Sequence, residues 1–214
     1  MRQIIALFFL FPIFGLTQIY EDFGFWSKFN CEFELNKSTS LNSKTELRTN
    51  ENSSNLKQLY TQFSIDKKFN KKLYTSFAWR PRLLNKEYNY IFNNRFHNDL
   101  TYKEKIGDLS IYLRFRSQYN FDPIGLNDFY ERTRLKLKYK FNKKTSAFIY
   151  NEFYFLLNNK SEQSNYNKTR FGVGIKHLIN SNLSLQLKYL RIKDVNIQTP
   201  LLINIIGISL SFKI

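Results

Sequence analysis

Histidine, serine and acidic side chains are the residues of this 214-residue sequence from which a hydrolytic site could be built. An outer-membrane hydrolase needs a serine within hydrogen-bond reach of a histidine, and an acid that orients the histidine. His97 alternates with Asp99, and Ser110 or Ser117 on the following segment could lie nearby, although Ser117 has the opposite phase. His177 has the phase of apolar neighbours and fits an interface position better. We therefore expect no enzyme, with a lipid-modifying hydrolase that uses His97 as the alternative.

Cysteine and metal chemistry are limited by composition. Cys31 is the single cysteine, so neither an intramolecular disulfide nor a cysteine metal site can form. It falls among apolar residues, where a free thiol behaves as a small hydrophobe. We expect no cofactor and no metal site.

Basic residues are the most abundant chemical groups, with 33 Lys and Arg against 17 Asp and Glu, and a formal charge of +16. They recur at every second position, as in Arg132, Arg134 and Lys136, instead of clustering in a recognition motif. This spacing argues against a nucleic-acid partner. It favours a basic surface or lumen that attracts anions.

Strict alternation of apolar and polar residues positions these groups. Residues 201–214 place Leu202, Ile206, Ile208, Leu210 and Phe212 on one face and small or polar side chains towards the end of the other, which predicts a β-strand. The same pattern recurs along the chain, and no helical period competes with it after the N-terminus. We predict an all-β fold, an antiparallel transmembrane up-and-down β-barrel of about 10–12 strands.

The connections between the expected strands alternate in length. Short Asn/Lys turns, such as residues 70–72 and 142–144, alternate with longer polar loops, such as residues 49–55 and 158–167. Outer-membrane barrels have short periplasmic turns and longer outer loops. We count eleven strands, whereas bacterial barrels of one chain have even numbers. Either a twelfth strand lies hidden around residues 50–60 or in a long loop, or one segment, for which the N-terminal stretch is the candidate, does not span.

The N-terminus resembles an export signal. Arg2 precedes an apolar stretch, and Gly15 and Thr17 are the small residues expected before a cleavage site. We predict a signal peptide at residues 1–17 and a barrel domain at residues 18–214. The predicted location is the cell outer membrane, with outer-membrane lipid as a partner and an oligomeric state that the sequence does not define.

The polar faces of the strands should line the lumen. The predicted basic lining residues are Arg80, Arg95, Arg114, Arg116, Arg132, Arg134, Lys136 and Arg170, and the predicted acidic ones are Glu32, Glu34, Glu46, Asp66 and Glu152. In a narrow barrel, long side chains can reach across the interior. Acids and bases could pair and fill the lumen, or the basic wall could form a narrow pore that favours anions.

Two further expectations concern the chain end and the fold class. The terminal strand should close the barrel against the strand near Phe23, and the barrel-assembly machinery should recognise Leu210, Phe212 and Ile214. A soluble periplasmic barrel of the lipocalin kind is the alternative architecture, with its apolar face turned inward.

Several short segments recur in the pattern of a known family: Asp22-Phe23-Gly24-Phe25-Trp26, Phe77-Ala78-Trp79-Arg80, Arg132-Thr133-Arg134, Asn151-Glu152-Phe153, Arg170-Phe171-Gly172-Val173-Gly174 and Ile206-Gly207-Ile208. In these segments the sequence resembles an uncharacterised family of outer-membrane proteins, domain-of-unknown-function family 2490. The resemblance spans essentially the whole mature chain and implies an outer-membrane β-barrel. It brings no activity, so no catalytic or binding residue is carried over.

Overall fold

The computed structural model is a closed β-barrel. It describes residues 20–86, 89–121, 123, 125, 127–158, 164–197 and 199–214. The predicted signal peptide lies outside these residues. Within the described ranges there are eleven strands: β1 (Tyr20–Asn36), β2 (Thr39–Asn50), β3 (Asn55–Lys68), β4 (Leu73–Lys86), β5 (Asn89–Ile106), β6 (Leu109–Phe121), β7 (Asp128–Lys140), β8 (Thr145–Leu156), β9 (Tyr166–Leu178), β10 (Leu183–Asp194) and β11 (Leu201–Lys213). In the same residues, no helix has the length and apolar character needed to cross a membrane.

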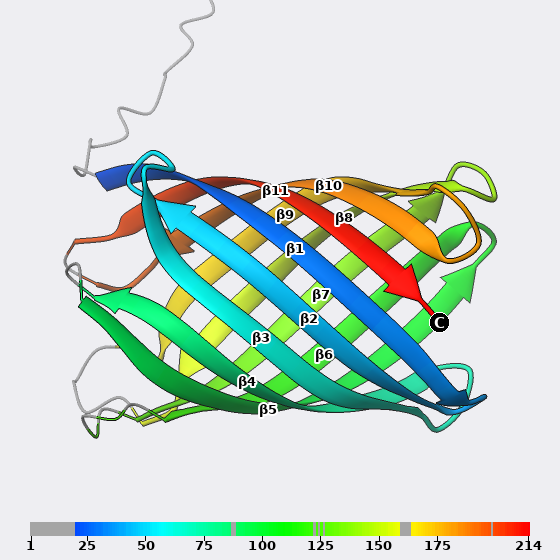
Figure 1. Ribbon diagram of the computed structural model, residues 1–214, viewed down its shortest axis with the longest axis horizontal. Coiled ribbons are helices and arrows are strands. Elements are labelled where there is room, and N and C mark those ends of the chain that lie inside the picture. Colours follow the sequence, from blue (N-terminus) through cyan, green and yellow to red (C-terminus); the bar gives the residue numbers. More distant parts are fainter. Residues whose placement is uncertain are drawn as a thin grey trace, which may run out of the picture.

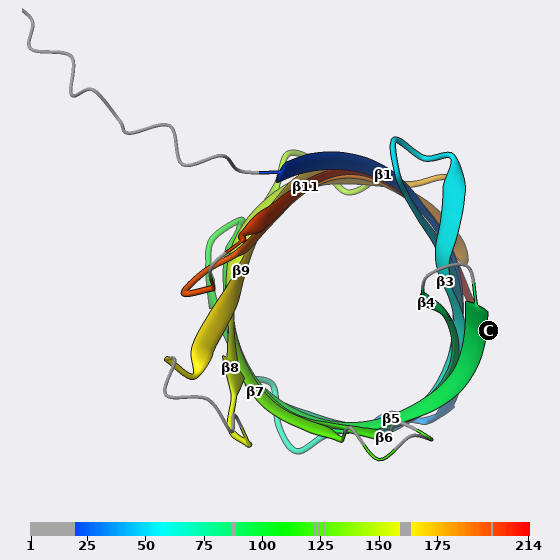
Figure 2. The same ribbon diagram turned by 90° about the vertical axis from the view of Figure 1, so that its left-hand side faces the viewer.

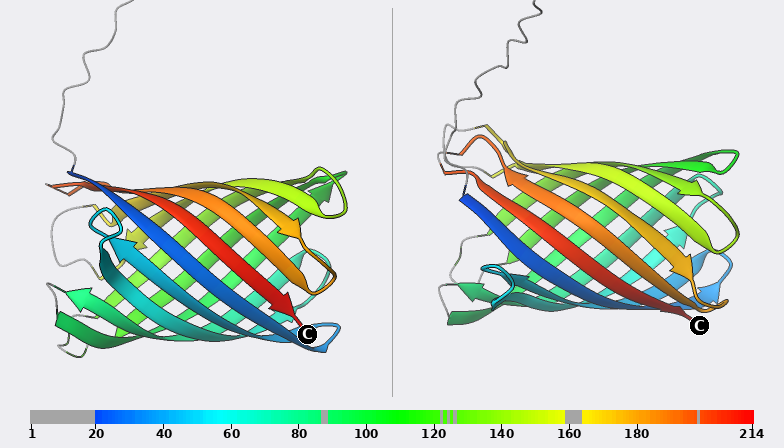
Figure 3. Two further views of the ribbon diagram at one scale, coloured as in Figure 1. Left: turned by 45° about the horizontal axis from the view of Figure 1, so that its top comes forward. Right: turned by 90° about the horizontal axis from the view of Figure 1, so that it is seen from above.

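Each strand pairs with its sequence neighbours in antiparallel fashion, and β1 closes the ring against β11 (Figures 1 and 2). An up-and-down chain with an odd number of strands ends in the direction in which it began, so the closing pair must be parallel. The register runs from Tyr20 opposite Leu201 to Glu32 opposite Lys213, and the two strands lie side by side in all views (Figure 3). The prediction that the terminal strand pairs with the strand near Phe23 is confirmed.

The expectation of an even strand number is wrong for this chain. β1 is a full-length strand that pairs along both edges, so the N-terminal stretch does span. β3 already begins at Asn55 and pairs with β2, which leaves no room for an extra strand around residues 50–60. Parallel closure removes the need for a twelfth strand.

Four of the short turns repeat one hydrogen-bonding device. Asn36, Asn70, Asn142 and Asn180 each accept, through the side-chain Oδ1, the backbone N–H groups two and three residues later, at 2.8 or 2.9 Å. An Asn side chain that binds its own backbone in this way reverses the chain. The fifth turn, between β5 and β6, contains Gly107 at a φ of 57° instead. We call the end of the barrel that carries these turns the turn end, and the opposite end the loop end.

A proline cannot donate to a central ladder, so the sequence predicts that the strand from Leu73 ends at Pro81. This prediction is wrong. β4 continues to Lys86, with Pro81 opposite Asn94 of β5. The pairing with β3 is interrupted there, passing from Phe63–Trp79 to Tyr60–Arg82. The missing N–H is thus accommodated by a local gap in the ladder. The strand's continuation brings Arg82 into the lumen.

Alternation along the strands separates an apolar outer face from a charged interior. Phe63, Phe77, Trp79 and Phe96 are exposed on the outside, where neighbouring rings stack at centroid distances of 6.0 and 6.4 Å. Most of the buried polar and charged side chains point inward, including Arg80 at 4% exposure. A soluble barrel of the lipocalin kind has the opposite polarity.

Part of the inner wall of β9 and β11 is made of small residues, which are Gly172 and Gly174 on β9 and Gly207 and Ser209 on β11. A Cβ on Gly174 would lie 2.4 Å from the backbone oxygen of Leu187, and one on Gly207 would meet the side chain of Lys188. The ring of Phe148 lies against Gly174, and Tyr150 lies against Gly172. Large side chains from β8 and β10 can therefore lie along the wall.

Candidate functional site

The lumen contains two chambers, one towards each end of the barrel. The loop-end chamber has a volume of about 590 Å³ and the turn-end chamber about 500 Å³. Lys44, Arg114, Arg116 and Arg134 line both chambers. These four side chains therefore mark the boundary between the two chambers.

The loop-end chamber is strongly basic. Among the residues that the structure describes, thirteen Lys and Arg line it against three acids. The basic residues are Lys44, Arg48, Arg80, Arg82, Lys86, Arg95, Arg114, Arg116, Arg132, Arg134, Lys168, Arg170 and Lys188, and the acids are Glu46, Asp128 and Glu152. Fixed positive charge in a narrow cavity with low-dielectric walls raises the local concentration of anions.

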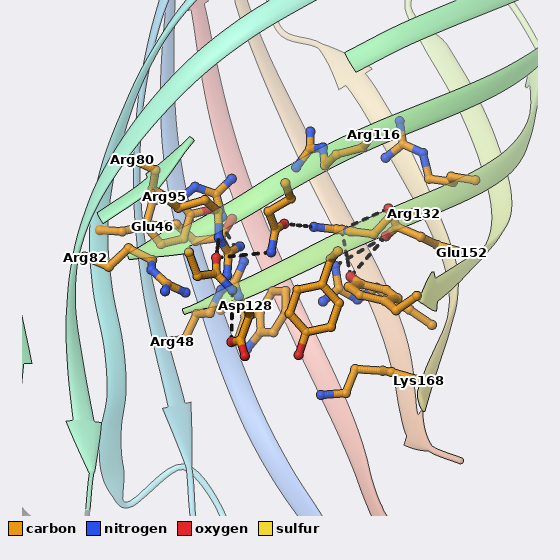
Figure 4. A pocket seen from close by; sticks show the side chains of 18 of the residues that line it. Glu46, Arg48, Arg80, Arg82, Arg95, Arg116, Asp128, Arg132, Glu152 and Lys168 are labelled. Atoms are coloured by element: carbon orange, nitrogen blue, oxygen red, sulfur yellow. Dashed lines mark hydrogen bonds and ion pairs between the residues drawn. The ribbon is translucent and has the colours of Figure 1, made fainter. Parts of the chain in front are cut away.

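Glu152 organises one side of this chamber. Its carboxylate accepts hydrogen bonds from Arg132 at 2.9 Å and from Arg114, and lies 3.6 Å from Arg170 (Figure 4). Tyr154 accepts a hydrogen bond from Arg132 at 2.7 Å and donates one to Glu152 at 3.3 Å. One buried carboxylate thus compensates guanidinium groups from β6, β7 and β9.

Asp99 has the same role at the boundary between the chambers. It accepts hydrogen bonds from Nε and Nη2 of Arg116 at 2.5 and 2.6 Å, and one from Arg114 at 3.4 Å. Such bidentate pairs fix both position and orientation. Arg114 bridges the two carboxylates, so Asp99 and Glu152 form one connected network.

Aromatic rings hold the guanidinium groups of the loop-end chamber. Arg48 lies over Trp26 at 3.7 Å from the ring centroid, and Arg80 lies over Tyr60 at 4.1 Å. Cation–π contacts of this kind stabilise a positive charge without neutralising it. The stacked arginines use in-plane N–H groups for oxygen acceptors: Nε of Arg48 donates to Glu46 at 2.5 Å, and Nε and Nη2 of Arg80 donate to Gln62.

The turn-end chamber is less basic than the loop-end chamber. Hydroxyl and amide side chains contribute much of its wall, and Asp66 accepts hydrogen bonds from Asn42 at 2.7 Å and Ser76 at 2.5 Å. His97 lies in this wall, 3% exposed, and its Nδ1 has no hydrogen-bond partner among the described residues.

The components of the alternative hydrolytic site do not come together. Both oxygens of Asp99 bind Arg116, so the acid does not orient His97. Ser117 faces outward and donates to Glu131 at 2.6 Å, while Ser110 is paired with Lys105 beyond the reach of His97 in the register. His177 is exposed and forms a 2.9 Å hydrogen bond with Thr145.

Most of the sequence-predicted lining residues lie in the interior. Seven of the eight basic residues line the loop-end chamber, and Lys136 lies over the inward ring of Phe148 at 4.3 Å. Glu46 and Glu152 line the loop-end chamber, and Glu32 and Asp66 the turn-end chamber.

Glu34 lies elsewhere, and its expected place in the lumen wall needs correction. It is at the rim of the turn end, with a side chain 42% exposed, and pairs with Lys213 at 2.7 Å. The pairing of β1 with β2 shifts between Glu34 and Asn36, at the end of the strand. Alternation therefore no longer decides which side chains line the interior.

Other lining residues were not predicted from the sequence. Arg48 and Lys188 have the inward phase of their strands and could have been found from it. Arg82 follows Pro81, and it therefore lies beyond the predicted end of its strand. Trp26, Tyr60 and Tyr154 are uncharged, and only charged residues were predicted to line the lumen. The alternation of β1 and β3 nevertheless places Trp26 and Tyr60 on inward positions.

The predicted assembly residues lie at the end of β11. Phe212 and Ile214 are exposed, at 38% and 60%, and Leu210 is half-buried on the same side. The backbone of Ile214 continues the seam with hydrogen bonds to Glu32 and Glu34 at 2.9 and 3.1 Å. These three side chains thus form an apolar end to the closing strand.

Comparison with known proteins assigns the family. The model of a family described as proteins of unknown function (DUF2490) matches residues 23–197. The chain belongs to this family. The match covers most of this DUF2490 barrel but leaves β11, including Ile206–Ile208, outside it. No curated protein matches.

A solved structure supports the barrel architecture of the DUF2490 chain. The NanC porin, in a rhombohedral crystal form, aligns with a TM-score of 0.54 over 78% of this chain and 84% of the porin chain, at 12% sequence identity. At this identity the likeness is one of fold. It is a likeness to a barrel that is described as a porin.

Proposed function

We propose that the protein is an outer-membrane β-barrel whose lumen admits small anionic solutes. The location is supported by the apolar outer face, because side chains such as Phe77 at 57% exposure and Ile175 at 54% would be costly to leave in water. Lipid is the surrounding that this face fits, and a closed barrel satisfies every backbone group there.

The observation that carries the anion preference is the excess of basic side chains lining the loop-end chamber. Glu46, Asp99 and Glu152 neutralise part of this charge, on arginines of β2, β6, β7 and β9, and the basic side chains still outnumber the acids. The acids therefore stabilise the barrel by compensating buried arginines. They do not cancel the positive electrostatic potential of the lumen. Arg114 and Arg116 line both chambers, and we expect their side chains to limit passage between the chambers to small solutes.

The experiment is a measurement of ion selectivity in planar lipid bilayers. Purified protein under a potassium chloride gradient is expected to give discrete channels whose reversal potential has the sign of chloride preference. Replacing Arg48 and Arg132 together by Gln should shift the reversal potential towards zero, whereas Lys71→Gln, in an exposed turn, should leave it unchanged. The absence of discrete channels at any voltage, or a preference for potassium, would contradict the proposal.

A further inference from the structure

Three pairs of arginines lie directly opposite each other on neighbouring strands inside the barrel. Arg114 faces Arg134 and Arg116 faces Arg132 across β6 and β7, and Arg80 faces Arg95 across β4 and β5. Like charges in directly opposed positions of a sheet destabilise it. Each pair therefore requires a nearby counter-charge.

The two pairs on β6 and β7 have counter-charges from the protein itself. Glu152 binds Arg114 and Arg132, and Asp99 binds Arg116 and Arg114. A buried charge that is paired and hydrogen-bonded in this way is tolerated.

The pair on β4 and β5 is held by neutral groups. Arg80 donates from Nε and Nη2 to the amide oxygen of Gln62 at 3.0 and 2.5 Å, and Arg95 donates from Nε to the amide oxygen of Asn120 at 2.7 Å. Among the described residues, neither arginine has a carboxylate within ion-pair distance. Amide oxygens satisfy N–H donors but supply no negative charge.

We propose that Arg80 and Arg95 form a binding site for an oxyanion, a carboxylate, phosphate or sulfate group of a small solute. The inference rests on the proposed function for the entry of such solutes, and it adds a defined place where they bind. A bound oxyanion would take the position relative to Arg80 and Arg95 that Glu152 takes relative to Arg114 and Arg132.

The geometry prepares both guanidinium groups for this ligand. The ring of Tyr60 and the amide of Gln62 fix the plane of Arg80, and Asn120 fixes Arg95. Both arginines line the loop-end chamber. Figure 4 shows Arg80 and Arg95 beside each other, on the side of the chamber opposite Glu152. Guanidinium groups held in this way bind oxyanions through charge-assisted, often bidentate hydrogen bonds.

Titration calorimetry of the detergent-purified barrel with inorganic phosphate tests the site. Arg80→Gln and Arg95→Gln should each weaken phosphate binding about tenfold or more, since each removes a charge-assisted hydrogen bond. Arg170→Gln is the matched control, because it removes the same charge from the same chamber but leaves Glu152 paired with Arg114 and Arg132. It should change the affinity by less than about threefold. An equal loss in all three variants would show a general field effect and overturn the site.

A second variant tests the counter-charge directly and does not remove an arginine. Gln62→Glu places a carboxylate where Arg80 already donates two hydrogen bonds. It should raise the thermal midpoint in phosphate-free buffer and abolish most of the stabilisation that phosphate gives to the wild-type protein. Gln186→Glu is the control, because Gln186 lies on β10 opposite Lys176 and Ser209 and does not line the loop-end chamber, so the substitution adds the same charge away from Arg80 and Arg95. Unchanged stabilisation by phosphate in Gln62→Glu would overturn the proposal.

The two proposals fail separately. Phosphate binding that depends on Arg80 and Arg95, without channel conductance, would keep the site and remove the pore. Chloride-selective conductance without phosphate binding would keep the pore and remove the site.

Discussion

Glu152 shows how strongly a single residue can determine the interior of this barrel. It is 1% exposed and contacts guanidinium groups from three strands, two of them through hydrogen bonds. Among the described residues, Arg132 and Arg170 would otherwise have no counter-charge, and Arg114 would keep only its 3.4 Å contact with Asp99. The residue is therefore a structural requirement of the basic lumen.

Replacing Glu152 by Gln should destabilise the barrel by about 3 kcal/mol, because removing one partner of a buried ion pair leaves the other uncompensated. The measurement is the midpoint of urea unfolding of the reconstituted protein. Glu34→Gln is the control, since its pair with Lys213 lies at the exposed rim, and it should produce no measurable change. Equal unfolding midpoints for Glu152→Gln and the wild type would contradict the structural role.

Alternation alone predicts which side chains point into the lumen, but it does not predict their partners. Inward arginines such as Arg114 and Arg132 could be predicted, because alternation fixes the face of a side chain. The partners could not be predicted, because the amide that holds Arg80 and the carboxylate that holds Arg132 depend on the register between strands. The alternation within one strand fixes the face of each side chain, whereas the exact register depends also on the geometry of the connecting turns and loops.

At the level of elements, the seam between β1 and β11 distinguishes this barrel from even-stranded ones. Strand existence, turn positions and the closing partner were predictable from alternation and from Asn-rich turns. The parallel direction follows from the odd strand count, but the rule that such barrels have even numbers led to the expectation of a hidden or missing strand. Pro81 misled the prediction of β4 for a local reason, since a gap in one ladder is enough to accommodate it.

The parallel register can be tested with the single native cysteine. Cys31 lies opposite Phe212 across the seam, so Phe212→Cys should form a disulfide with Cys31 under mild oxidation. The product should migrate faster than its reduced form on a denaturing gel without reductant. Leu210 lies opposite Phe29, two residues before Phe212 on the same face of β11. Leu210→Cys should therefore not form a cross-link with Cys31. A cross-link in Leu210→Cys and none in Phe212→Cys would show a different register.

At the level of the whole molecule, polarity is inverted relative to a soluble protein, with charge inside and apolar rings outside. The two tryptophans lie on opposite sides of this division. Trp79 is 40% exposed on the outer face, and Trp26 is 6% exposed and lines the loop-end chamber. The fluorescence of Trp79 can therefore report on the outer face, and that of Trp26 on the lumen.

Fluorescence quenching of single-tryptophan variants in lipid vesicles tests this arrangement. With Trp26→Phe, brominated phospholipid should quench the remaining Trp79 strongly. With Trp79→Phe, brominated lipid should have little effect on Trp26, and iodide should quench it more than caesium does, because the basic chamber concentrates anions. Stronger quenching by caesium, or quenching of Trp26 by brominated lipid, would contradict the assignment of the two faces.

The seam also has a consequence for the order of events in folding. Ten of the eleven pairings join strands that are consecutive in the chain, but the seam joins residues about 180 positions apart. The free edge of β1 is synthesised first, and its partner is synthesised last. Pairings of such large sequence separation form slowly, and an unpaired edge is a template for association with other chains. Protection of the β1 edge during this interval is therefore a requirement that the topology itself imposes on the cell.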